Sequence, residues 1–187
     1  MKPARHVLAV FSVMSAASPA GAAITVFGSG EAVACYHAAE GRTGYAPGAQ
    51  SCRTALDTLA LSRDQKAATH VNFGIVLMHL SRPDDALRQY QAALDIDDTL
   101  GEAWVNRGIA RWHAARDARA ALADLDRGIA LGTTDPQVAH YVRGVVNEQL
   151  GRVRHAYADY MKAAELAPAW ELPKAELARF SVQPAPR

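Results

Sequence analysis

Apolar residues of contrasting size recur between residues 67 and 168 in three similar segments. Each segment has a glycine, an alanine about twelve residues later, a large side chain four residues after that, and a closing small residue. A repeat period in the mid-thirties is typical of helical hairpins that stack side by side, so the pattern predicts an all-α solenoid. The recurring positions are Gly74, Ala86, Tyr90 and Ala93, then Gly108, Ala121, Leu125 and Gly128, then Gly144, Ala156, Tyr160 and Ala163.

The recurring glycines are expected inside the first helix of each pair. A glycine in a helix interior costs up to about 1 kcal/mol relative to alanine. We expect the cost to be tolerated because the missing Cβ lets the second helix approach closely. The matching large positions of the first helices hold His70, Trp104 and His140, which we interpret as packing residues.

The three segments resemble tetratricopeptide repeats, in which each unit is a pair of antiparallel helices. The resemblance covers residues 67–168 and implies a right-handed α-solenoid of about three repeats. The distance between glycines grows from 34 to 36 residues, which we attribute to an extra residue in the second unit's turn and another before the third unit. The predicted units are 67–100, 101–136 and 137–169. The residues that carry the resemblance are Trp104-Val-Asn-Arg-Gly108, Ala121, Leu125, Gly128 and Pro168.

In the family that the chain resembles, the first helices line a concave groove. The groove expected here is mainly apolar, which suits an apolar peptide or the apolar face of an amphipathic helix. Some repeats of this kind clamp a terminal carboxylate with lysines, but this chain has valine at those positions. By periodicity the groove residues are Val71, Asn72, Ile75, Met78, His79, Val105, Asn106, Ile109, Trp112, His113, Tyr141, Val145, Glu148 and Gln149.

Four of these groove residues have expected roles. Trp112 and Tyr141 are predicted anchors for a partner, because large aromatic side chains dominate many interfaces. Asn72 and Asn106 are expected to hydrogen-bond the backbone of an extended peptide.

The first residues have the layout of a bacterial secretory signal peptide. Two basic residues precede the uncharged run 7–13, and small residues follow at the spacing that a signal peptidase reads. The run is too short to span a bilayer. We expect cleavage after Ala22 or Ala23, which makes 1–23 the signal peptide and the periplasm the destination.

Two cysteines, Cys35 and Cys52, lie ahead of the repeats. An even number of cysteines in an exported chain favours a disulfide. The turn-forming residues 41–48 separate two short helical segments, so an antiparallel hairpin would bring the sulfurs together. We therefore predict a degenerate, disulfide-linked helical hairpin over 24–65 that caps the front of the stack.

Two other interpretations of the cysteines stay open. Ala32–Cys35 weakly resembles the site at which bacterial lipoproteins are cleaved and acylated, although Glu31 separates it from the apolar run. Free or redox-active thiols are disfavoured because the chain contains no Cys-x-x-Cys motif.

The far end of the stack also needs a cover. A short amphipathic helix over 174–180 is predicted to lay Leu177 and Phe180 on the last repeat, completing a repeat region of 66–180. Residues 181–187 are expected to form a disordered tail.

Composition and charge narrow the function. Half of the residues are apolar and only 7% are aromatic, which is a helical composition. The net charge is +1, and without the signal 18 basic residues stand against 19 acidic ones, so no basic field would attract nucleic acid. The chain has no nucleophile-elbow, phosphate-loop or His-Glu-x-x-His motif, so neither catalysis nor a cofactor is predicted.

These observations predict a periplasmic scaffold or adaptor that binds another protein or peptide in the repeat groove. The alternative is a structural or assembly subunit of an envelope complex, or a self-associating protein, whose apolar face is permanently covered. A weaker third hypothesis is a metal ion held by His79 and His113 with Glu148 nearby.

Overall fold

The computed structural model describes residues 23–26, 30–58, 60–114 and 117–180. In these ranges the regular secondary structure is helical throughout, and no helix has both the length and the hydropathy needed to cross a membrane. Most of the expected signal peptide and the whole expected tail lie outside the described residues. The helices are α1 (Glu31–Ala39), α2 (Tyr45–Thr58), α3 (Arg63–His79), α4 (Pro83–Ile96), α5 (Gly101–Ala114), α6 (Ala118–Leu131), α7 (Pro136–Gln149), α8 (Val153–Leu166) and α9 (Glu171–Leu177).

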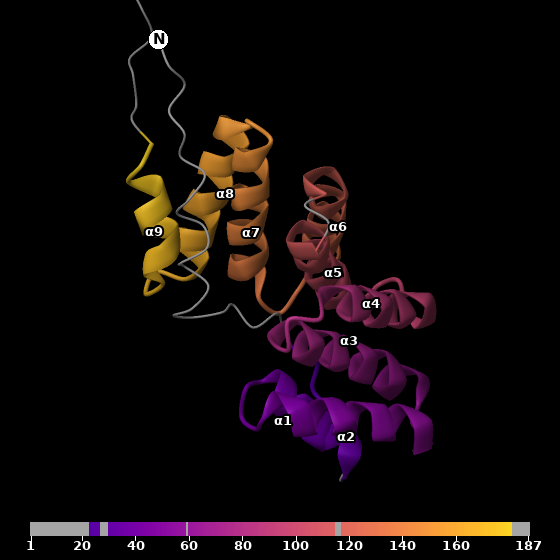
Figure 1. Ribbon diagram of the computed structural model, residues 1–187. Helices are drawn as coiled ribbons and strands as arrows, with labels where there is room; N and C mark the ends of the chain where they lie inside the picture. Colours follow the sequence, from indigo (N-terminus) through magenta and orange to yellow (C-terminus); the bar gives the residue numbers. More distant parts are fainter. Residues whose placement is uncertain (1–22, 27–29, 59, 115–116, 181–187) are drawn as a thin grey trace, which may run out of the picture.

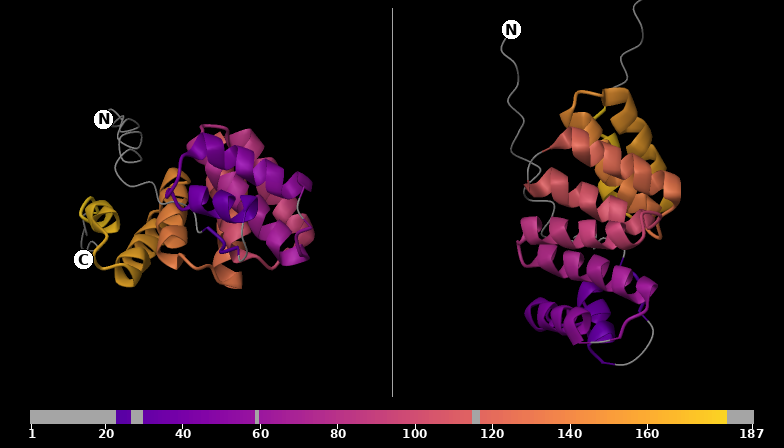
Figure 2. Two further views of the ribbon diagram at one scale, coloured as in Figure 1. Left: turned by 90° about the horizontal axis from the view of Figure 1, so that it is seen from below. Right: turned by 90° about the vertical axis from the view of Figure 1, so that its right-hand side faces the viewer.

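Successive helices pack as pairs that stack along one direction. The pairs are α1 with α2, α3 with α4, α5 with α6 and α7 with α8, and α9 packs on α8 at the end (Figure 1). The second helix of each pair contacts the first helix of the next, so the chain builds a continuous stack (Figure 2). This arrangement confirms the predicted α-solenoid.

Helix α5 joins the two main parts of the apolar core. Ala103 and Ala110 belong to the part built with α1–α4, whereas Val105 and Trp112 belong to the part built with α6–α8. Since the two sets alternate along one helix, α5 buries opposite sides against its two neighbours. The half-buried side chains of α5, Ile109 among them, are therefore the ones that remain accessible at the surface.

The glycines permit the close helix contacts that were predicted. A Cβ built on Gly74 would lie 2.3 Å from Cε1 of Tyr90, and one on Gly144 would lie 2.7 Å from Cε1 of Tyr160. At Gly108 the nearest atoms, in Ala121 and Leu125, are 3.0 Å away. The first helix therefore receives the large side chain of the second helix directly against its backbone.

Two predicted helix boundaries are wrong by several residues. Helix α2 begins at Tyr45, inside the predicted turn 41–48, and α9 begins at Glu171 rather than at residue 174. Pro47 and Pro173 lie in the first turns of these helices, where the missing N–H has no helical partner to lose. Both prolines therefore lie inside helices and do not mark turns.

The extra residues between the glycines do not lengthen a turn as predicted. Relative to Gly108, α5 ends one position later than α3 does relative to Gly74. Helix α7 begins one position earlier relative to Gly144 than α5 does relative to Gly108. The helices therefore take up the additional length.

The predicted disulfide joins Cys35 of α1 to Cys52 of α2. Their Cα atoms are 4.7 Å apart, and both side chains are completely buried. A Cβ on Gly48 would lie 2.1 Å from the Cβ of Ala38, so the two helices are in close contact beside the bond. Because the Cys35 sulfur is bonded to Cys52, the structure does not support acylation of Cys35.

The last pair is covered as predicted. Leu177 and Phe180 pack against the core of α7 and α8, and the Phe180 ring meets that of Tyr160 with centroids 6.0 Å apart. Arg179 adds hydrogen bonds of 3.1 and 2.9 Å to the carboxylate of Glu148. Both apolar and ionic contacts thus hold the end of the chain on the stack.

Candidate partner-binding groove

The first helices of the pairs lie next to one another along the stack. Helix α1 contacts α3, α3 contacts α5, and α5 contacts α7. A surface formed by these helices is continuous from the disulfide-linked hairpin to the third repeat. This is the surface on which the sequence places the groove.

Residues 23–26 already occupy part of this surface, and we call them the N-terminal strap. The backbone N–H of Ile24 donates to Oδ1 of Asn72 at 2.9 Å, and Nδ2 of Asn72 donates to the Ile24 carbonyl at 2.7 Å. Thr25 is exposed, whereas Val26 is only 5% exposed. This alternation is typical of an extended backbone.

The strap lies between the hairpin and the first repeat. Val26 shares an apolar cluster with Ala32 of α1, Ala55 of α2 and Ala68 of α3, and Ile24 packs against the same cluster. The side chain of Thr25 points to α1, where its hydroxyl lies 3.4 Å from that of Tyr36. Helices on both sides of the strap therefore hold it in place.

The predicted groove residues differ in how far they reach the surface. The half-buried ones can contact a ligand directly, whereas the buried ones shape the surface from below. Gln149 is exposed, and Met78, His79, Ile109, His113, Val145 and Glu148 are half-buried. The buried ones are Val71, Asn72, Ile75, Val105, Asn106, Trp112 and Tyr141.

Trp112 and Tyr141, the two aromatic residues predicted to be anchors for a partner, are both buried. Trp112 is 7% exposed, and its indole N–H donates to Oε1 of Gln149 in α7 at 2.6 Å. Tyr141 is 9% exposed, and its ring packs on that of Trp170 with centroids 4.9 Å apart. Burial and the nearby carboxylate of Glu176 raise the pKa of Tyr141 to about 12. Trp112 thus joins two neighbouring helix pairs, and Tyr141 joins the last pair to the segment that begins α9.

Two residues of the metal hypothesis have other contacts. The His79 ring stacks on that of Tyr45 with centroids 4.2 Å apart, and burial lowers the pKa of His79. Glu148 accepts hydrogen bonds from the Tyr160 hydroxyl and from Arg179. Within the described residues no three histidine, cysteine or carboxylate side chains are grouped so as to hold a metal ion. The arrangement therefore gives the metal hypothesis no support.

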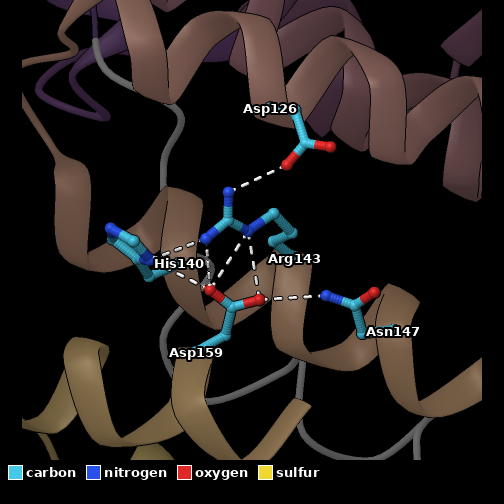
Figure 3. Close-up of polar contacts among 5 residues, drawn as sticks. All are labelled: Asp126, His140, Arg143, Asn147 and Asp159. Carbon is cyan, nitrogen blue, oxygen red and sulfur yellow. Dashed lines mark hydrogen bonds and ion pairs between the residues drawn. The ribbon is translucent and has the colours of Figure 1, made fainter. Parts of the chain in front are cut away.

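A buried polar cluster in the third repeat was not predicted (Figure 3). The carboxylate of Asp159 in α8 accepts from Arg143 at 2.6 and 3.0 Å, from Asn147 at 3.0 Å, and contacts Nδ1 of His140 at 3.1 Å. Burial alone would raise the pKa of Asp159, but the hydrogen bonds from His140 and Arg143 outweigh it and lower that pKa. His140 is therefore part of a polar network as well as a packing residue.

Arg143 also joins two repeats. Its Nη1 donates to Oδ1 of Asp126 in α6 at 2.8 Å, while its other nitrogens contact Asp159 (Figure 3). One guanidinium group thus links α7 to both second helices beside it. Planar, multiple donors make arginine suited to such a link.

The second repeat contains the equivalent arrangement. Arg107 donates to both carboxylate oxygens of Asp124 in α6, at 2.9 and 2.8 Å, and to Oε1 of Gln91 in α4 at 2.5 Å. The sequence carried a signal for both clusters. An arginine precedes Gly108 and Gly144, and an aspartate follows Ala121 and Ala156 by three residues.

The strap is a contact in the candidate groove that sequence reasoning missed. Asn72 was expected to hold an extended backbone, but the strap residues were divided between the signal peptide and the hairpin. The β-branched run Ile24-Thr25-Val26 was an available signal, because such residues favour extended structure.

The arrangement of helices is similar to that of several known proteins. No protein-family model matches the sequence, and neither does any curated protein. Solved structures do match, however. MamA superposes with a TM-score of 0.64 at 20% sequence identity, over 81% of this chain and 82% of that one.

Two further solved structures are described as tetratricopeptide-repeat proteins. The first such domain of Spaghetti (RPAP3), bound to the HSP90 peptide SRMEEVD, has a TM-score of 0.58 and 24% identity over 62% of this chain and 90% of that one. YrrB, described as having an unusual peptide-binding site, has a TM-score of 0.61 and 18% identity over 77% and 70%. At these identities the likeness establishes one thing: this chain has the fold of a tetratricopeptide-repeat protein.

Proposed function

We propose that this chain is a non-catalytic protein–protein interaction module that binds an extended segment of a partner protein along its first helices. The observation that carries the proposal is the pair of hydrogen bonds between Asn72 and the backbone of Ile24. An asparagine that binds both the N–H and the carbonyl of one residue recognises a peptide backbone and not a particular side chain. Such recognition suits an extended ligand.

The rest of the surface supports the same proposal. Met78, Ile109 and Val145 are half-buried apolar residues on α3, α5 and α7. Asn106 lies in the second repeat at the position that Asn72 has in the first. Two of the similar structures bind peptides or are described as doing so, which favours a polypeptide ligand over a small molecule.

Site-directed crosslinking in the native host tests the proposal. We expect Ile109→Asp to remove the partners that crosslink to the wild-type groove, because a carboxylate there must be desolvated when a partner covers it. Leu166→Asp is the matched control, since Leu166 is 40% exposed on α8 and does not belong to the groove. Unchanged partners in Ile109→Asp, with helicity retained, would rule out this surface as the site.

A stripe on the last helix pair favours a second candidate function, that of an assembly subunit. Val153, Tyr157 and Met161 succeed one another every four residues on α8 and are 54%, 37% and 51% exposed. Residues at this spacing share one face of a helix. Sedimentation over a range of concentrations tests self-association: a constant monomer mass would argue against it.

We also propose that the protein is exported to the periplasm after signal cleavage. The disulfide between Cys35 and Cys52 supports this proposal, because structural disulfides persist mainly in oxidising compartments. The basic and apolar start of the chain supports it independently.

A further inference from the structure

We infer that the N-terminal strap is a built-in occupant of a peptide subsite, and that a partner segment binds this subsite by displacing the strap. The displacing segment is an extended peptide with aliphatic residues at two positions separated by one residue of any kind. This inference rests on the proposed function, since it names the ligand of the same surface.

The backbone contacts define the first requirement on the ligand. Asn72 is completely buried, and its carboxamide is bonded to the N–H and the carbonyl of Ile24. A buried amide that loses its hydrogen-bond partners is destabilising. The strap is therefore expected to leave when another backbone replaces both bonds, and a proline cannot do so because it has no N–H.

The apolar contacts define the second requirement. Val26 is enclosed by alanines from three helices, and Ile24 packs beside it, so the subsite offers room for aliphatic side chains. Thr25 between them is exposed, and its 3.4 Å contact with the Tyr36 hydroxyl lies at the surface, so this position in a ligand tolerates different side chains. The resulting pattern is aliphatic, any residue, aliphatic.

The attachment of the strap makes exchange feasible. Both of its main-chain hydrogen bonds to α3 go to the single side chain of Asn72. By contrast, the neighbouring hairpin is held by a disulfide and by packing on α3. Segments held by few contacts open locally at a lower free energy than the core around them.

Peptide binding to the full mature chain tests the inference. The probe is an end-blocked, fluorescently labelled peptide that carries the sequence Ala-Ile-Thr-Val. We expect Ile24→Asp, which weakens the strap, to bind the probe about tenfold or more tightly than wild type, because the subsite is then mostly vacant. Adding Asn72→Ala to that variant should abolish binding, and the control Thr25→Ala should bind as wild type does.

Hydrogen exchange provides a second measurement that does not depend on a variant. In wild-type protein that begins at Ala23, and so keeps the Ile24 amide, this amide should lose its protection at saturating probe while the amides of α3 keep theirs. Two results would overturn the proposed displacement of the strap. One is unchanged protection of the Ile24 amide at saturating probe. The other is equal affinity of folded Ile24→Asp and wild type for the probe. If Ile109→Asp still lost its crosslinked partners, that outcome would leave the groove as a partner site and remove only the strap from it.

Discussion

Arg143 and Asp159 face each other across the third helix pair, and two nitrogen atoms of Arg143 contact both carboxylate oxygens of Asp159. Because Arg143 also reaches Asp126 in the preceding pair, it couples the internal packing of the third repeat to the junction with the second repeat. Arg107 couples Asp124 and Gln91 in the same way one repeat earlier. Removing one carboxylate should therefore affect more than a local contact.

We expect Asp159→Asn to lower the free energy of unfolding by about 2 kcal/mol at pH 7, because it replaces a buried carboxylate that is paired with the half-buried Arg143. The folded-state pKa of Asp159 is lowered, so its stabilising effect is complete above the unfolded pKa of about 3.9. The effect is lost as the pH falls through the folded pKa. Urea unfolding between pH 7 and pH 3 measures the difference between variant and wild type.

Asp126→Asn is the matched control for that experiment. Asp126 is bonded to the same arginine, but its side chain is 56% exposed, so we expect an effect below about 1 kcal/mol. Equal losses in both variants would contradict a special role for the buried carboxylate. The difference in the free energy of unfolding between Asp159→Asn and wild type should become smaller toward pH 3. A difference that stays constant would contradict the lowered pKa of Asp159.

The glycines provide a graded prediction. Gly74→Ala should lower the free energy of unfolding by about 1–3 kcal/mol, because its new Cβ would overlap the ring of Tyr90. Gly108→Ala should cost less, since its nearest neighbours are at 3.0 Å and alanine favours a helix by up to about 1 kcal/mol. Chemical denaturation of the two variants measures both decreases in the free energy of unfolding. A larger decrease for Gly108→Ala than for Gly74→Ala would contradict the prediction.

Removal of the disulfide should lower the stability by a definite amount and mainly in one part of the protein. Replacing Cys35 and Cys52 together by serine should lower the free energy of unfolding by about 3 kcal/mol, because the bond closes a loop between residues 17 apart. Hydrogen exchange should locate the loss in α1 and α2. Uniform loss of protection through α7 and α8 would show that the bond stabilises the whole stack and not only its front.

Export can be checked at the N-terminus. Edman sequencing of the protein from the periplasm should begin at Ala23 or at Ile24, according to which of the two expected bonds is cleaved. With either start, the Ile24 nitrogen and carbonyl remain available to Asn72. A start after Val26 would remove the strap and contradict the further inference, whereas protein retained with residues 1–22 in the cytoplasm would contradict export.

Contacts between residues of the same repeat unit could be predicted from the sequence. The helix pairs and the contact between Gly74 and Tyr90 follow from spacing within a unit, and an even cysteine count indicated the disulfide. Trp112 illustrates what periodicity leaves out: a residue on the inner side of a first helix can point to solvent or into the seam with the next first helix. Trp112 points into the seam because its indole N–H bonds Gln149, a residue 37 positions further along the chain.

The strap could not be predicted for a related reason. Its contact with Asn72 joins residues 48 apart, and no local pattern in 23–26 indicates where an extended segment will lie. The expectation that Asn72 binds a backbone was chemically sound, because an amide side chain presents both a donor and an acceptor. The occupant, however, comes from the chain itself.

The two ends of the stack are secured by different chemistry. A covalent bond closes the front pair, whereas exposed ion pairs such as Arg179 with Glu148 help to hold α9 at the back. Salt screens exposed ion pairs but leaves a disulfide intact. Because each pair contacts only its neighbours, unravelling begins at a terminus and travels inward. Solvent conditions therefore act differently on the two ends: a reductant loosens the front pair, whereas high salt weakens the ionic part of the contact at the back and leaves the apolar contacts of Leu177 and Phe180 in place.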